Sequence, residues 1–158
     1  MNNDDLDTIR TILKSAHVAT VTTRSGDDLH SRPLGLINND EFDGSLWFFT
    51  QDPSPKTHDV SEHPEVNVSV AESKGYLSLS GTASVVHDQS LIERFWGPGA
   101  EAWFDGKDDP TAALLRVDVA TAEYWSMDKP AVARFFEIAR AIVTKTPPDV
   151  GDNKTVTV

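Results

Sequence analysis

The sequence contains no cysteine, and this absence removes a whole class of chemistry. Disulfide bonds, thiolate nucleophiles and cysteine-ligated metal sites are excluded, and a chain without cysteine fits a reducing compartment. Long apolar runs are absent too: no stretch approaches the roughly 20 residues of a membrane-spanning helix. The start, MNNDDLDTIR, is acidic and has no apolar signal region. We therefore expect a cytoplasmic protein that does not enter a membrane.

Positive charge is also scarce. The chain has 14 lysine and arginine residues against 25 aspartate and glutamate residues, which gives a formal net charge of -11. A field of this sign repels nucleic acid and anionic membranes, so we expect neither as a partner. An anion-binding site in this chain must gather its few cations locally.

Several catalytic and metal-binding motifs are missing as well. There is no G-x-S-x-G and no glycine-rich loop of the P-loop or Rossmann type. His58 and His63 lack the i, i+4 spacing of a helical metal pair, and Asp105 to Asp109 does not fit the calcium-loop pattern. We predict no metal site, and no side chain stands out as a catalytic acid or base.

What is present is the pattern of one β-rich domain. The chain has 158 residues, of which 39% are hydrophobic and 25% charged, as is ordinary for a globular protein with its own core. We predict a domain over residues 1–145 and a loosely held polar tail over residues 146–158, where residues 155–158 could add a short strand.

Short alternating runs separated by turns predict six antiparallel strands. The expected strands cover residues 17–23, 29–37, 45–50, 65–72, 76–86 and 114–125, and the expected helices residues 4–15, 55–62, 89–96 and 129–144. Because strand–helix–strand alternation does not persist, an antiparallel barrel with peripheral helices fits better than a doubly wound parallel sheet. Gly81, within the fifth strand, predicts a bulge or a close backbone approach.

The second predicted strand contains an Arg32-Pro33 pair. Proline cannot donate to a strand ladder, so it belongs at an edge or a bulge, and it holds the preceding residue extended. Arg32 is thus kept straight where the ladder is interrupted, and it can face a ligand there. An ordinary edge strand with a solvated arginine accounts for the same pair.

The segment FFTQDPSPK, after the third strand, has the features of an anion site. Ser54 can cap a helix that Pro55 begins, and free N–H groups at a helix start attract anions. Lys56 lies in the first turn, where the helix dipole disfavours a cation, so its presence calls for a negative partner. A plain helix cap with a surface lysine is the alternative. Together with Arg32, the segment favours a phosphate site more than either feature does alone.

Aromatic side chains cluster near predicted strand ends and in the irregular stretch WGPGAEAWFDGKDDP. They are Trp47, Phe48, Phe49, Trp96, Trp103, Phe104, Tyr124 and Trp125. A planar heteroaromatic ligand stacks well on such residues, while core packing accounts for most of them.

Six segments appear in an order typical of a known family: ATVTTRSGDDLHSRPLG, DGSLWFFTQDPSPK, HPEVNVSV, YLSLSGTASVVHD, AWFDGKDDP and AEYWS. In this combination the chain resembles the pyridoxamine 5'-phosphate oxidase-like FMN-binding split barrels, most of all the general stress protein branch. The resemblance implies a mainly β fold, a six-stranded antiparallel split β-barrel with flanking helices. It also implies a homodimer with FMN at the subunit interface.

The resemblance also implies which residues bind the cofactor. Ser54 and Lys56 would hold the phosphate, Trp125 would reach toward the cofactor from the end of the last barrel strand, and Trp103 would come from the partner subunit. The full set of implied residues is Ser31, Arg32, Pro33, Phe49, Thr50, Ser54, Lys56, Trp103 and Trp125.

Two departures from the family argue against pyridoxamine phosphate as the substrate. Oxidases of that substrate carry an Arg-x-His motif after the last tryptophan, whereas Trp125 is followed by SMDKPAVARFF. They also carry a lysine shortly after the first flavin-binding arginine, whereas Arg32 is followed by PLGLIN. We expect an FMN-dependent oxidoreductase that uses a small-molecule electron donor and acceptor. A non-catalytic flavin-binding or sensor protein, and a barrel that binds deazaflavin or haem, are the alternatives.

Overall fold

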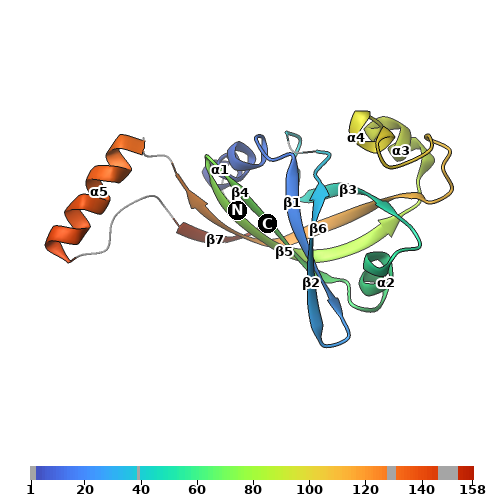
Figure 1. Cartoon of the computed structure of the whole chain (residues 1–158), viewed down its shortest axis with the longest axis horizontal. Helices are drawn as coiled ribbons and strands as arrows, with labels where there is room; N and C mark the ends of the chain where they lie inside the picture. The colour runs from blue at the N-terminus through green and yellow to red at the C-terminus, as the bar shows by residue number, and fades with distance from the viewer. Residues whose placement is uncertain (1–2, 39, 128–130, 146–152) are drawn as a thin grey trace.

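The computed structural model describes residues 3–38, 40–127, 131–145 and 153–158, without the side chains of residues 131–137. Its centre is one antiparallel sheet with the strand order β2-β1-β4-β5-β6-β3, and β7 pairs with β6 (Figure 1). The strands are β1 (Val18–Ser25), β2 (Asp28–Gly35), β3 (Ser45–Gln51), β4 (Glu65–Glu72), β5 (Gly75–Val86), β6 (Ala112–Ser126) and β7 (Asn153–Thr157).

The helices lie around the sheet. They are α1 (Asn3–Leu13), α2 (Pro55–Glu62), α3 (Gln89–Phe95), α4 (Pro98–Glu101) and α5 (Ala131–Thr144). Figure 1 shows α2 beside the β1–β2 hairpin, α3 and α4 together at one end, and α5 beyond the other end, where β6 finishes. Among the described residues, no helix combines the length and the apolar character needed to cross a bilayer.

The sheet curls into a barrel that closes at one short contact. Its two edge strands, β2 and β3, meet through an isolated bridge between Leu36 and Phe48, and the Ile37 N–H donates to the Trp47 carbonyl at 3.0 Å. Along the rest of its length β2 pairs only with β1, and nearly all of it is exposed. The predicted antiparallel split barrel is confirmed.

The prediction of six strands is wrong by one. Residues 153–157 form β7, which extends the sheet from β6. A buried carboxylate holds this strand in place: Lys154 Nζ lies 2.7 Å from Asp5 Oδ2, and the Tyr124 hydroxyl donates to Asp5 Oδ1 at 2.9 Å. The partners come from α1, β6 and β7, so the pattern of any single segment does not reveal them.

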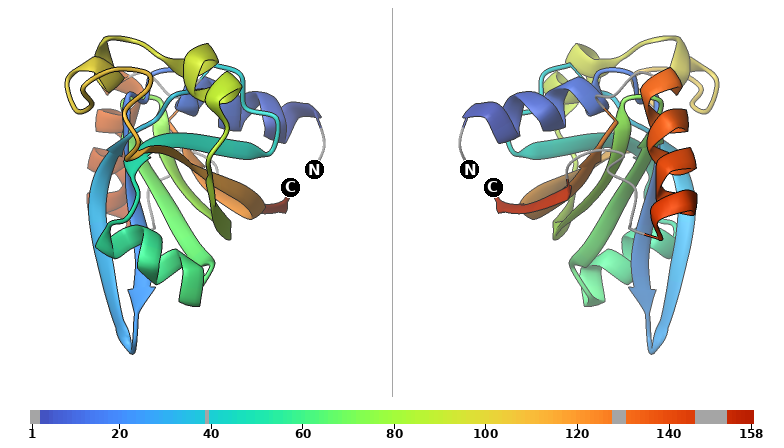
Figure 2. Two further views of the ribbon diagram at one scale, coloured as in Figure 1. Left: turned by 90° about the vertical axis from the view of Figure 1, so that its right-hand side faces the viewer. Right: turned by 90° about the vertical axis from the view of Figure 1, so that its left-hand side faces the viewer.

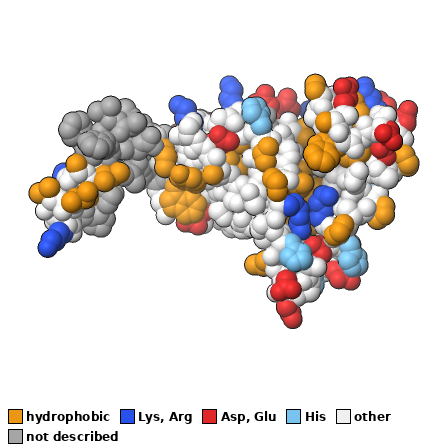
Figure 3. All heavy atoms as spheres, viewed as in Figure 1, with side chains coloured by type: hydrophobic (Ala, Val, Ile, Leu, Met, Phe, Trp, Pro, Cys, Tyr) orange, Lys and Arg blue, Asp and Glu red, His pale blue; other side chains and the backbone are white. Residues whose placement is uncertain are grey.

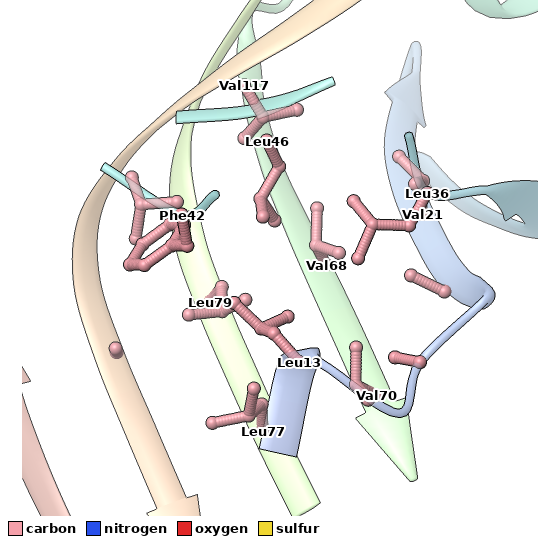
Figure 4. Close-up of a cluster of buried hydrophobic side chains, with 14 of the residues drawn as sticks. Leu13, Val21, Leu36, Phe42, Leu46, Val68, Val70, Leu77, Leu79 and Val117 are labelled. Carbon is pink, nitrogen blue, oxygen red and sulfur yellow. The ribbon is translucent and has the colours of Figure 1, made fainter. Parts of the chain in front are cut away.

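The hydrophobic core fills the interior of the barrel. Alternate residues of β4, including Val68 and Val70, point inward with Leu79 of β5 and Leu46 of β3 (Figure 4). Leu13 of α1 packs against this cluster and is fully buried. Each such side chain contributes about 1.5–3 kcal/mol through removal from water, and the packed interior fixes the strand ends that carry polar side chains.

Gly81 lies at the predicted irregularity. The β5–β6 register shifts between Ser80 and Gly81, and an added Cβ at Gly81 would lie 2.0 Å from the Asp118 carbonyl oxygen. This close approach lets the longest strand pair of the sheet bend around the barrel.

We predict that Gly81→Ala destabilises the protein by about 3 kcal/mol, because the new methyl group must displace the backbone of β6. Urea denaturation measures this loss. Gly99→Ala is the matched control, since a Cβ there meets nothing within 4 Å. Equal stability of the two variants would contradict a close approach at Gly81.

Candidate functional site

A cavity of about 500 Å³ opens beside the barrel's short closing contact. Residues 33–37 at the end of β2, residues 49–51 of β3, Lys56, His17 and parts of residues 95–104 line it. The left view of Figure 2 faces this side, with α3 and α4 above β3 and α2 below it. A volume of this size suits a cofactor or other small molecule.

One end of the cavity is basic because of how α2 begins. Ser54 caps the helix by accepting from the Thr57 N–H, and the Thr57 side chain returns a contact to the Ser54 N–H. Lys56 follows in the first turn, and its Nζ donates to Ser54 Oγ at 3.4 Å. Burial, and then the positive charge of Arg32, lower the pKa of Lys56. A bound anion would relieve the second of these effects.

Arg32 faces a buried acceptor pair. Its Nη1 donates to Thr23 Oγ1 at 2.7 Å, and its Nη2 lies 3.7 Å from Asp59 Oδ2. Asp59 is only 5% exposed. Burial acts to raise the pKa of Asp59, but hydrogen bonds from Thr23 and Ser25 and the nearby positive charge outweigh burial, so that pKa is lowered.

The basic end has two cationic side chains, Arg32 and Lys56, and one buried carboxylate, Asp59. Asp59 pairs with Arg32, and Lys56 lies near Arg32. Asp52, at the start of the same loop, is engaged by His87 at 2.7 Å. Figure 3 shows basic side chains gathered where the β1–β2 hairpin leaves the barrel beside α2. In a chain with a net charge of -11, this local excess of positive charge favours the approach of an anion.

The opposite wall is aromatic. Phe49 packs edge-on against Trp96, with ring centroids 5.8 Å apart, and Phe104 lies 5.9 Å from Phe49. Asp88 caps α3, and Pro98 starts α4 one residue after Gly97, so the stretch expected to be irregular includes a short helix. The indole of Trp103 is 78% exposed at the cavity.

The structure brings most of the predicted site residues together. Five of them line this cavity within a single chain: Pro33, Phe49, Thr50, Lys56 and Trp103. The Thr50 side chain is buried and donates to the Gln51 carbonyl at 3.3 Å. Ser54 and Arg32 lie directly behind the basic end, within reach of Lys56.

Two predicted residues lie elsewhere. The Ser31 hydroxyl is 2.8 Å from that of Thr22 on exposed strand positions. Trp125 pairs with Tyr76 and Asn153 near the far end of β6. It is about 40 Å along that strand from Ala113, the partner of Thr50, at roughly 3.3 Å per residue.

Sequence reasoning missed the groups that support the basic end. Asp59 lies one helical turn after Lys56, so α2 presents both side chains on the same side. That spacing was a usable signal, whereas nothing in the sequence joins Thr23 to Asp59 across 36 positions. Gly97, Gly99 and Ala100 were also missed, and their small size leaves room beside the aromatic wall.

Ionisable side chains are few in the cavity lining. Among the described residues that line the cavity, only His17 and Lys56 titrate. The described part of the chain also has no group of three metal-ligating side chains. A cavity with Lys56 at one end, Arg32 behind it, and aromatic rings at the other end fits a planar ligand with an anionic tail.

We predict that Asp59→Asn destabilises the protein by roughly 1–2 kcal/mol at neutral pH, because Arg32 loses its charged partner. The folded-state pKa of Asp59 is lowered, so its stabilising contribution is present above the unfolded pKa of about 3.9. The contribution is lost as the pH falls through the folded value. Urea denaturation from pH 7 to pH 3 should show the gap between wild type and variant closing. Asp27→Asn, at a fully exposed side chain, is the control. A gap that stays constant with pH would contradict the assignment.

Comparison with known proteins agrees with this architecture. Residues 4–149 match the family model described as pyridoxamine 5'-phosphate oxidase like. Protein bli-3 of Neurospora crassa is 30% identical over 158 residues, which cover 93% of this chain and 75% of the relative. The crystal structure of a putative general stress protein 26 from Jannaschia sp. CCS1 has a TM-score of 0.79 and 26% identity, and covers 99% of this chain and 100% of that one.

A second solved structure connects the fold with a ligand. The general stress FMN/FAD binding protein of Xanthomonas citri has a TM-score of 0.69 and 26% identity, and covers 79% of this chain and 92% of that chain. The family model spans nearly the whole barrel, including every residue of the basic end. The chain therefore belongs to the pyridoxamine 5'-phosphate oxidase-like family, and it is similar to the general stress proteins within it.

Proposed function

We propose that the protein is an FMN-binding flavoprotein. The observation that carries the proposal is the basic end of the cavity, where Arg32 and Lys56 lie close enough to repel each other and one buried carboxylate, Asp59, pairs with Arg32. A phosphate dianion supplies the missing negative charge, and the N–H groups at the start of α2 add to its binding. The similar Xanthomonas citri protein, named for FMN/FAD binding, supports a flavin as the ligand.

The remaining cavity suits the flavin ring. Phe49 and the exposed Trp103 offer aromatic surfaces, and Pro33 brings a strand edge without an N–H to the rim. Ser54 lies beside Lys56 on the phosphate side, and Thr50 lines the cavity. These assignments place the anionic tail near α2 and the ring toward α3 and α4.

We propose further that the protein is an oxidoreductase with a small-molecule electron donor and acceptor. Bound FMN supplies the electron transfer, while the protein residues bind and orient it. Absorbance of the FMN-loaded protein at the flavin band, followed anaerobically with NADH and then NADPH, tests this role. Bleaching within seconds supports an enzyme. A flavin that neither nucleotide reduces favours the alternative, a non-catalytic flavin-binding or sensor protein.

The position of Trp125 leads us to propose a homodimer with FMN at its interface. Trp125 is 37% exposed, and its neighbour across the strands, Tyr76, is 43% exposed, although both are large aromatic residues. In one chain Trp125 is remote from the cavity. A two-fold dimer that covers this aromatic pair can bring the tryptophan of one subunit to the cavity of the other.

We predict that Arg32→Ala and Lys56→Ala each weaken FMN binding by about 1.5–3 kcal/mol, because each removes one charge-assisted contact to phosphate. Quenching of flavin fluorescence on titration measures the dissociation constants. Lys74→Ala, at an exposed lysine outside this cavity, should leave FMN affinity unchanged. Wild-type affinity in both cavity variants would overturn the phosphate assignment.

The dimer proposal makes a separate prediction about mixed variants. Arg32→Ala and Trp125→Ala subunits, each impaired in FMN binding, should regain about one quarter of the sites when mixed and allowed to exchange. Half the dimers are then mixed, and each mixed dimer has one intact site. Flavin stoichiometry after gel filtration measures the recovery. Mixing Arg32→Ala with Lys56→Ala should restore nothing, because both residues belong to one cavity. Absence of recovery in the first mixture, or a monomer with bound flavin, would contradict the interface.

A further inference from the structure

Three side chains from different elements form a continuous chain behind the cavity. Arg32 on β2 donates to the Thr23 hydroxyl of β1 at 2.7 Å, and that hydroxyl donates to Asp59 Oδ2 of α2 at 2.9 Å. Thr23 is 1% exposed and Asp59 is 5% exposed, so both are shielded from water. The Arg32 side chain, at 24% exposure, is the end that reaches toward the surface.

The hydroxyl of Thr23 sets the direction of donation in this series of hydrogen bonds. A hydroxyl has one proton to donate and oxygen lone pairs to accept with. Here the Thr23 hydroxyl donates its proton to the Asp59 carboxylate and accepts a hydrogen bond from the Arg32 guanidinium. A valine of the same shape could do neither, while a serine could do both.

Arg32 therefore experiences opposing forces from one helix. Asp59 attracts it, and Lys56, three positions earlier on α2, repels it. His30 and Ser25 also face the carboxylate. Since β2 is an exposed edge strand, a guanidinium with no acceptor behind it would be free to turn into solvent.

We infer that Thr23 and Asp59 are positioning residues, which hold the Arg32 guanidinium at the basic end and so set the preference for phosphorylated flavin over riboflavin. This inference rests on the proposed function. The two ligands share the ring and differ at the phosphate, so the ratio of their affinities reports on the basic end alone.

The test compares Thr23→Val, Thr23→Ser and Asp59→Asn with wild type, by titration with FMN and with riboflavin. We expect Thr23→Val and Asp59→Asn to weaken FMN binding about tenfold while riboflavin affinity stays within about twofold. Thr23→Ser should stay near wild type for both ligands. An equal loss for both ligands in Thr23→Val would mean general damage to the fold, and unchanged FMN affinity would mean that Arg32 needs no support. Either result overturns the inference.

A ligand-free measurement separates this inference from the proposed function. If the wild-type protein binds no FMN, the proposed function fails. The positioning role is then judged from the Nε–H signal of Arg32 in ¹⁵N NMR spectra, assigned by its loss in Arg32→Lys. A held guanidinium gives slow exchange with water in wild type and Thr23→Ser, and faster exchange in Thr23→Val. Equal exchange rates in all three proteins would refute positioning.

Discussion

The bridge between Leu36 and Phe48 is the only place where the two edge strands of the sheet pair with each other in the described chain. Away from this bridge, β2 diverges from β3, and its backbone pairs with β1 alone. The cavity exists because the barrel is left open here. Pro33 fits this geometry, since a residue without an N–H loses nothing on an unpaired edge. The opening in turn lets α2 approach from one side and the α3–α4 segment from the other.

The balance between Arg32, Lys56 and Asp59 sets the charge at one end of the opening. The chain carries a net charge of -11, yet α2 has Lys56 in its first turn, against the helix dipole, and places it near Arg32. Asp59, one turn later, neutralises part of this charge from the buried side. The balance leaves an excess of positive charge at this end, and such an excess favours anions over neutral molecules.

Much of this could be predicted from local sequence. The Ser54-Pro55 cap located the start of α2, and alternation located β4 without error, because both signals depend on neighbours in the chain. The contact of Thr23 with Asp59 and the pairing of β7 could not be predicted in this way. They depend on groups brought together by the closed sheet, and no short pattern encodes that proximity. For the same reason the sequence placed Trp103 and Trp125 in one set, whereas within one chain Trp103 lines the cavity and Trp125 lies near the far end of β6.

The buried Asp5 carboxylate connects the two ends of the described chain. It lies in the first helix, and its cation, Lys154, lies in the last strand. Lys154 of β7 therefore helps to neutralise a charge that α1 takes out of water. During synthesis on a ribosome, most of the barrel can pack before this cation emerges. This neutralising contact then forms only after β7 has been made.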